Sequence, residues 1–396
     1  MSLAALGIGA LIVIGMVALW PGSVEPPPDA AALRRGSLLE ATVTSIELVT
    51  CGSSAAERSA DVGTPAAPGG PMCRAIGLTL EEGRDAGSTT TIELPDVATA
   101  PNLEMGERVI LERPIEPIPG VPYGFYDRIR TPSLTWLAVG FGALVVLLGR
   151  LRGLAALAGL AASIGVLLVF VIPAILQGTS PVLVASVGAG AIAFLVLYLA
   201  HGFEEKTTVA LVGTLTGIGI TLLLSVIWAP LARLSGLASE SAYVVQAVGV
   251  EIDLNGLLLA GIVIGALGAI DDVAVTQASA IWELKQADPE LEPRSLFRKG
   301  MRVGRDHVGS IVNTLALAYA GASLPLLILF QLSEQPLGQL VGSEVVATEI
   351  VRTLVGSIGL VAAMPVTTWL AANVAGRERP LEDVPVPPVS ESSRPA

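Results

Sequence analysis

Residues 256–283, GLLLAGIVIGALGAIDDVAVTQASAIWE, form an apolar run long enough to cross a bilayer, and they carry Asp271 and Asp272 near its middle. About 20 apolar residues in a helix span the hydrocarbon core. An aspartate at the centre of such a helix costs roughly 2.5–3.5 kcal/mol on insertion scales, so it normally faces a protein interior or a water-filled cavity. The run therefore predicts a membrane helix with one polar side.

The polar side of this helix follows the helical repeat. Asp272, Thr276, Ser279 and Glu283 fall at i, i+4, i+7 and i+11 and form one stripe, whereas Asp271 lies about 100° around the helix. Such a stripe has two interpretations. It is either a polar contact between packed helices or the lining of a path for an ion or a polar solute.

The composition places the whole chain in the same class. Of 396 residues, 52% are hydrophobic and 15% are charged, and the mean hydropathy is +0.69, which is typical of a polytopic helical membrane protein. The 43 glycines suit helices that pack closely in lipid. The net charge of −12 argues against a nucleic-acid surface, so we expect no nucleic-acid partner.

Hydropathy predicts eight crossings of the membrane. The first, residues 3–20, is an apolar run without a preceding Lys or Arg and without a small-residue cleavage site, so we expect an uncleaved anchor, with a signal peptide as the alternative. The other seven are residues 134–148, 154–176, 182–200, 208–229, 256–283, 308–330 and 349–374.

The basic residues predict the orientation of these spans. An even number of crossings puts both termini on one side, and the short loops on that side hold nearly all the Lys and Arg residues, while the other short loops hold only Arg233. Loops rich in Lys and Arg stay in the cytoplasm, so we expect both termini to be cytoplasmic. The expected domains are an anchor (1–20), an extracytoplasmic domain (21–132), a seven-helix membrane domain (133–376) and a disordered cytoplasmic tail (377–396).

The extracytoplasmic domain, residues 21–132, reads as a small all-β fold. Five short β-prone runs, separated by Gly, Pro, Asp and Asn, predict a barrel-like domain of the OB or SH3-like sort. Residues 56–71 lack an apolar period and predict a mobile loop. Cys51 and Cys73 flank this loop, and outside the cytoplasm they are expected to form a disulfide; two free thiols are the alternative. Neither histidine of the chain lies in this domain, which disfavours a metal site there.

A second polar stripe lies on the seventh span. Asp306, Ser310 and Asn313 follow at i, i+4 and i+7, with Thr314 beside Asn313. Antiparallel neighbours joined by a short loop tend to pack together, so the sixth and seventh spans are expected to face each other through these stripes. Oxygen ligands and carboxylates suit a hard cation or a proton. Asp272 is the expected carrier, and a hydrogen-bonded helix pair without transport is the alternative.

The fifth span is a further polar helix, because Thr207, Thr208 and Thr214 stand among glycines. Threonines often bond to their own helix, and glycines permit close packing or a break in it. Catalytic patterns are missing: the stretch GAID departs from the G-x-G-D of intramembrane aspartyl proteases, and H-E-x-x-H, G-x-S-x-G and Walker A motifs do not occur. We therefore expect neither an enzyme nor a cofactor.

Four strings carry a resemblance to the bacterial YibE/F-like membrane proteins. They are GRLRG (149–153), HGF followed by KTTVALVGTLTG (201–217), LGAIDDVAVTQASAIWE (267–283) and GRDHVGSIVNTLALAYAGASLPLLILF (304–330). The resemblance covers most of the membrane part. It aligns Asp272, Thr276 and Ser279 with the family's polar positions and leaves Asp271 as an addition of this chain.

The resemblance implies a multi-pass protein of the bacterial plasma membrane with a transport role. The function expected from the sequence is thus a secondary transporter or permease for an ion or small polar solute, with a polar route between the sixth and seventh spans. The alternative is a membrane anchor that presents its β domain to an envelope partner. Besides the lipid bilayer, a second copy of the chain stays open as a partner, and the metal content stays unknown.

Overall fold

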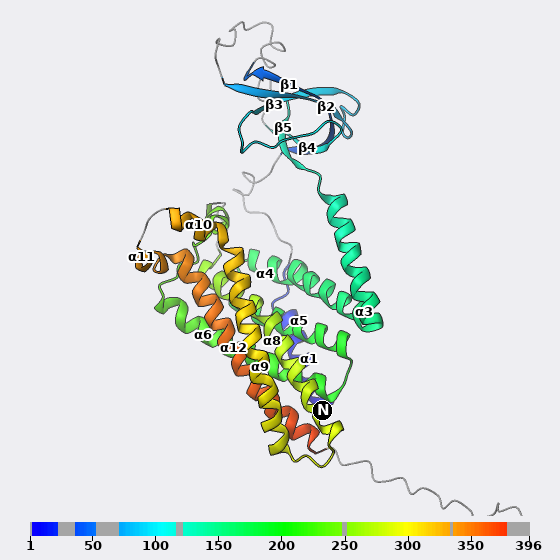
Figure 1. Cartoon of the computed structure of the whole chain (residues 1–396), viewed down its shortest axis with the longest axis vertical. Coiled ribbons are helices and arrows are strands. Elements are labelled where there is room, and N and C mark those ends of the chain that lie inside the picture. Colours follow the sequence, from blue (N-terminus) through cyan, green and yellow to red (C-terminus); the bar gives the residue numbers. More distant parts are fainter. Residues whose placement is uncertain are drawn as a thin grey trace, which may run out of the picture. The chain divides into compact units, whose positions relative to one another are not determined.

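The computed structural model describes residues 2–22, 36–52, 71–115, 122–247, 252–332 and 336–377. The chain divides into two compact units (Figure 1). Pro27–Leu144 form the β unit, and Met1–Pro26 together with Val145–Ala396 form the helical unit. The predicted loop at residues 56–71 and the predicted tail at 377–396 lie almost entirely outside the described residues.

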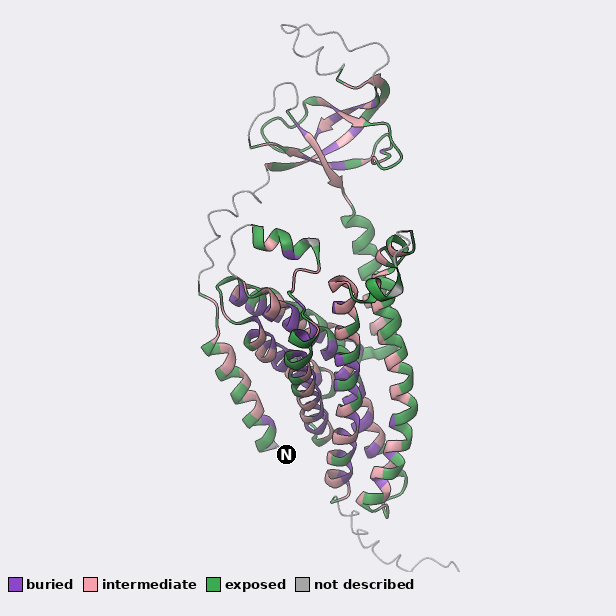
Figure 2. Ribbon diagram, turned by 90° about the vertical axis from the view of Figure 1, so that its left-hand side faces the viewer, coloured by how far each residue is buried: buried purple, intermediate pink, exposed green. Residues whose placement is uncertain are grey.

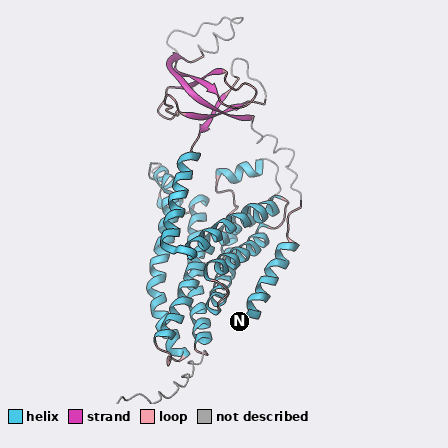
Figure 3. Ribbon diagram, turned by 90° about the vertical axis from the view of Figure 1, so that its right-hand side faces the viewer, coloured by secondary structure: helices cyan, strands magenta, loops and turns pink. Residues whose placement is uncertain are grey.

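The β unit contains one antiparallel sheet, and the described strands are confined to it (Figure 3). Each of the five β-prone runs contains one strand: β1 (Ser37–Thr50), β2 (Met72–Leu80), β3 (Thr89–Pro95), β4 (Arg108–Arg113) and β5 (Gly124–Arg128). Their order across the sheet is β3-β2-β1-β4-β5. No backbone ladder joins β3 to β5 among the described residues, so the sheet is a half barrel, and its OB or SH3-like type stays a prediction.

The long central strand β1 organises the sheet. Its first residues, from Ser37 to Thr42, pair with β4, and its later residues, from Ala41 to Thr50, pair with β2. The register shifts between Val43 and Ser45, where a bulge bends the strand. The side chains that alternate inward form a small apolar core, which includes Val43, Ile76 and Leu111. Cys51 and Cys73 are joined in a disulfide where β1 ends and β2 begins.

Two helices in the first part of the chain are not plain single spans, and the second of them begins within the β unit, which extends to Leu144. They are α1 (Ser2–Ala18) and α3 (Thr131–Val166), which continues through a π-helical turn, η2 (Leu167–Val171), into α4 (Ile172–Leu176). Arg150 interrupts α3 with φ 52° and ψ −129°. A Cβ on Gly153 would clash with the backbone carbonyl of Val145, so the chain doubles back closely at this point. The interruption lies between the two spans predicted at residues 134–148 and 154–176.

The remaining helices follow in the order of the chain: α5 (Pro181–His201), α6 (Glu205–Leu231), α7 (Glu240–Ala247), α8 (Leu254–Ala287), α9 (Pro293–Ala322), α10 (Leu324–Leu332), α11 (Leu337–Val341) and α12 (Glu344–Ala375). In the centre α6, α8 and α12 each pack against the other two, while α5 covers α6 and α8 and α9 covers α8 and α12. Buried residues concentrate on these central helices (Figure 2).

The number of spans differs from the prediction of eight when length and hydropathy alone are counted. Five described helices are long and apolar enough to cross a membrane, or six if α9 and α10, bent by 61°, form one span. The difference has two causes. The helix α1 is shorter than a full span, and the stretch Thr131–Leu176 counts once although it contains the interruption at Arg150.

Candidate functional site

The structure turns Asp271 toward α6. Thr214, which is completely buried, donates a hydrogen bond from Oγ1 to Asp271 Oδ1 at 3.2 Å. Asp271 is half-buried, and its neighbour Ile270 is fully buried against the core. Thr214 and Asp271 both belong to helices that are long and apolar enough to cross a membrane. A carboxylate of α8 is therefore held inside the bundle by a hydroxyl of another helix.

Close packing of small residues allows Thr214 and Asp271 to come into contact. A Cβ on Gly217, three residues after Thr214, would lie 2.6 Å from Ile270 Cγ2 and 3.0 Å from Ala363 Cβ of α12. A Cβ on Gly213 would overlap the hydroxyl of Thr367 on α12. Small residues let membrane helices approach until polar groups of neighbouring helices meet. The glycines of α6 thus bring Thr214 to Asp271.

Thr214 differs from most of the buried hydroxyls around it. Thr208, Ser225, Thr367 and Thr368 each donate to a carbonyl four residues earlier in their own helix. Such back-bonding uses the donor hydrogen of the hydroxyl within its own helix, so the hydroxyl can only accept a hydrogen bond from a neighbour. The hydroxyl of Thr214 instead crosses to α8. The sequence placed Thr214 on a secondary polar helix and did not pair it with Asp271.

The other two predicted threonines of α6 lie near its start. Thr208 is buried, and its Oγ1 is 3.0 Å from Tyr198 Oη of α5. Thr207 is buried as well and lines a small cleft with Ser279 of α8. Ser279 of α8, which the sequence predicted to face α9, therefore lies near the polar face of α6.

Asp272 points in another direction from Asp271. Its side chain is 66% exposed, and Oδ2 lies 4.0 Å from His307 Nε2 of α9. This pair becomes an ion pair only when the imidazole is protonated. Two adjacent aspartates on α8 therefore contact two different helices, α6 and α9, as the 100° step between neighbouring helical residues requires. Thr276 is half-buried farther along α8, and Glu283 is exposed.

The predicted facing of the two polar stripes is not what the structure shows. The helices α8 and α9 do pack together, but Asp306, Ser310, Asn313 and Thr314 are all exposed. The hydroxyl of Thr314 donates to the carbonyl of Ser310 in its own helix. Among the described residues, none of these four side chains forms a hydrogen bond or an ion pair with the α8 stripe.

A different face of α9 makes the contact with α8. Leu296, Gly300 and Gly304 recur every four residues and are buried. Gln277 of α8, 1% exposed, donates from Nε2 to the carbonyl of Gly300 at 2.7 Å. Small residues dictate which face of a membrane helix packs, and the polar stripe of α9 lies on the other side. Gln277 was missed from the sequence, although an amide inside a span and the spacing G-x-x-x-G were visible signals.

The described residues contain no cluster of three or more His, Cys, Asp or Glu side chains with the spacing of a metal site. The carboxylate of Asp271 and the hydroxyl of Thr214 bring oxygen atoms of two helices together in the core. Such oxygens can bind a proton or a hard monovalent cation.

Long apolar helices packed around a polar contact, together with a separate small β-sheet, define a multi-pass membrane protein. A family model described as YibE/F-like protein matches residues 137–377, which is more than half of the chain. The chain belongs to the YibE/F-like family. Comparisons with curated proteins and with solved structures gave no match.

Proposed function

We propose that this protein is a secondary transporter or permease for an ion or small polar solute, and that Asp271 with Thr214 is its ion-coupling site. The observation that supports the proposal is the hydrogen bond of 3.2 Å between these side chains in the core of the bundle. An ionisable residue inside a membrane bundle is costly and usually marks an ion path or a proton relay. A purely structural contact would not need a carboxylate.

The polar route that we propose uses both aspartates. Asp271 faces α6 in the core, and Asp272 lies near His307 toward α9. The exposed stripe of Ser310 and Asn313 on α9 continues this polar surface. Polar side chains in a spanning helix normally face water or protein rather than lipid. The route thus shifts from the predicted contact of α8 with α9 to a path that begins between α6 and α8.

We propose eight crossings for the topology. They are α1, the two arms of α3 on either side of Arg150, α5, α6, α8, α9 with α10, and α12. Both termini would then be cytoplasmic in a bacterial plasma membrane. A cysteine introduced at Asp288, between α8 and α9, should be protected from a membrane-impermeant maleimide in intact cells. One introduced at Ser180, between α4 and α5, should react; the opposite pattern would refute this orientation.

Transport is tested by ion flux in proteoliposomes. The purified chain is reconstituted, gradients of H⁺, Na⁺ and K⁺ are applied one at a time, and entrapped fluorescent indicators report their decay. We expect the native protein to dissipate at least one gradient. Asp271→Asn should lower that rate by about tenfold or more, which corresponds to about 1.4 kcal/mol. Glu290→Gln, an exposed carboxyl in the loop that follows the same helix, is the matched control and should leave the rate unchanged.

Two outcomes would refute the proposal. One is undiminished flux through Asp271→Asn, and the other is native protein that dissipates none of the three gradients. The variant Asp272→Asn separates the two aspartates. A larger loss there than in Asp271→Asn would make Asp272, with His307 as its neighbour, the coupling carboxylate.

The second candidate function is a membrane anchor that presents the β unit to an envelope partner. The β unit supports this second function. Its strand β1 pairs with β4 through its first half and with β2 through its second half, and a bulge lies near the middle. One long strand shared in this way is typical of small five-stranded barrels such as OB folds, which bind ligands on their sheet. An anchor without transport would show no flux in any variant. It would also retain its envelope partner when Asp271 is changed.

A further inference from the structure

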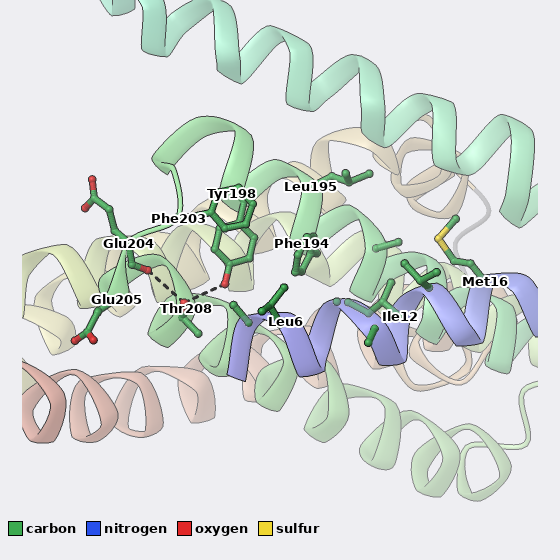
Figure 4. Close-up of a pocket in the computed structure, with 15 residues that line it drawn as sticks. Leu6, Ile12, Met16, Phe194, Leu195, Tyr198, Phe203, Glu204, Glu205 and Thr208 are labelled. Atoms are coloured by element: carbon green, nitrogen blue, oxygen red, sulfur yellow. Dashed lines mark hydrogen bonds between the residues drawn. The ribbon is translucent and has the colours of Figure 1, made fainter. Parts of the chain in front are cut away.

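A long groove lies between α1 and α5 and ends at the start of α6 (Figure 4). Its volume is about 840 Å³, within the roughly 300–1,000 Å³ that small-molecule sites occupy. Leu6, Ile12 and Met16 line it from α1, and Phe194 and Leu195 line it from α5. This length of the groove is apolar and suits a hydrocarbon chain.

The end of the groove near the N-terminus of α1 has a different chemistry. The rings of Tyr198 and Phe203 stack at 4.5 Å, and Phe194 packs on Tyr198 at 4.7 Å. Tyr198 Oη lies 3.0 Å from Thr208 Oγ1 (Figure 4). Phe203 is 81% exposed, so its ring is open to a ligand. An exposed aromatic face attracts an ammonium group.

Two carboxylates complete this end. Glu204 and Glu205 line the groove through their stems, and their carboxylates point away from its apolar length (Figure 4). Glu204 is paired with Lys206, whose Nζ lies 2.7 Å from Oε2. Glu205 has no ion-pair partner among the residues that the structure describes. One negative charge is therefore left over beside the aromatic rings.

We propose that this groove binds one phospholipid with a zwitterionic, amine-bearing head group, a phosphatidylethanolamine. An acyl chain lies along α1 and α5, and the ammonium group meets Glu205 and the ring of Phe203. The carboxylate of Glu205 repels an anionic head group, so phosphatidylglycerol binds more weakly. This site is separate from Asp271 and does not depend on transport.

Native mass spectrometry of the full chain in detergent micelles tests the site. Equal amounts of phosphatidylethanolamine and phosphatidylglycerol are added, and retained lipid is counted as mass adducts. We expect one phosphatidylethanolamine to be retained at least about fivefold more often than phosphatidylglycerol. Glu205→Gln should remove this preference, because an amide no longer attracts the ammonium group.

Binding of the acyl chain in the apolar part of the groove is tested separately. Ala10 lines the groove on α1, so Ala10→Phe should fill it and abolish retention of the single lipid. Ala4, exposed on the same helix and outside the lining, gives the matched control Ala4→Phe, which should retain lipid as the native chain does. Equal retention of both lipids by the native chain would overturn the proposal. Retention that survives Ala10→Phe would do the same, and if that variant unfolds, the result with Glu205→Gln decides.

Discussion

Thr214 on α6 and Asp271 on α8, which are 57 residues apart in the chain, meet through a hydroxyl-to-carboxylate hydrogen bond of 3.2 Å. The donor is completely buried. Hydrogen bonds to charged groups contribute roughly 1.5–3 kcal/mol, about twice as much as neutral ones. This contact therefore influences how the carboxylate of Asp271 is oriented and, in the transport function proposed above, how readily it would exchange an ion.

The first prediction concerns this hydroxyl. Thr214→Val keeps the shape of the side chain and removes the donor, so we expect ion flux in proteoliposomes to fall by about tenfold. Thr214→Ser should retain most of the native rate. Thr216→Val is the matched control, because Thr216 donates to the carbonyl of Val212 in its own helix. Equal losses in Thr214→Val and Thr216→Val would contradict a specific role for Thr214.

The second prediction concerns the helix contact beside the site. At Gly217 a methyl group would press on Ile270 and Ala363, whereas at Gly219 it would meet open space. Overpacking costs about 1–3 kcal/mol, so Gly217→Ala should lower the free energy of unfolding by that amount. Gly219→Ala should leave it unchanged or raise it slightly, because alanine favours helix. Thermal unfolding in detergent, followed by tryptophan fluorescence, measures the difference; a lower melting temperature for Gly219→Ala alone would speak against the packing.

The third prediction concerns the disulfide of the β unit, which joins residues 22 positions apart. Opening it should destabilise the sheet by about 3 kcal/mol on the chain-entropy model. Cys51→Ser should therefore increase the rate of tryptic cleavage at Arg74 of β2 and Arg108 of β4 in reconstituted protein. The double variant with Cys73→Ser should behave like the single one, since either change removes the same bond. Unchanged cleavage would show that the bond does not stabilise the sheet.

The fourth prediction concerns alkaline pH. Tyr123 donates from Oη to Asp85 Oδ2 at 2.9 Å, and burial, followed by this hydrogen bond and the charge of Asp85, raises the tyrosine pKa above 10.0. The neutral hydroxyl is the favoured form in the folded state. Its stabilisation is therefore complete below the ordinary pKa and is lost as the pH rises through the higher folded-state pKa.

Tyr123→Phe checks this prediction. The variant should lose about 1 kcal/mol of stability at neutral pH, the usual net value of one hydrogen bond. It should also show a weaker decline of stability between neutral and strongly alkaline pH than the native chain, measured by the same cleavage assay. If the stability of the native chain and that of Tyr123→Phe declined in parallel with rising pH, the role of Tyr123 would be contradicted.

Local patterns in the sequence predicted the elements well. Period-two runs such as the one containing Ile76 and Leu78 became strands, because alternation needs only one buried face. The apolar runs became long helices for a similar reason, since their composition alone favours a bilayer. The family was also visible in four strings of the sequence, and the match over residues 137–377 confirms it.

The partners of the polar residues could not be predicted in the same way. Which face of α9 packs depends on Gly300 and Gly304, and these meet Gln277, a residue of the preceding helix α8. The stripe from Asp306 to Asn313 is polar and for that reason predicts an inner face, but close approach of helices favours small residues. The pairing of Asp271 with Thr214 likewise depends on the packing of α6 against α8, which no local pattern encodes.

The bond between Cys51 and Cys73 has a practical consequence for spectroscopy. The chain contains 2 cysteines, and both are used in this bond. A thiol introduced anywhere in the helices would thus be the sole reactive one. Paired spin labels on α1 and α5, or on α6 and α8, can therefore report the distances between these helices without first deleting native cysteines.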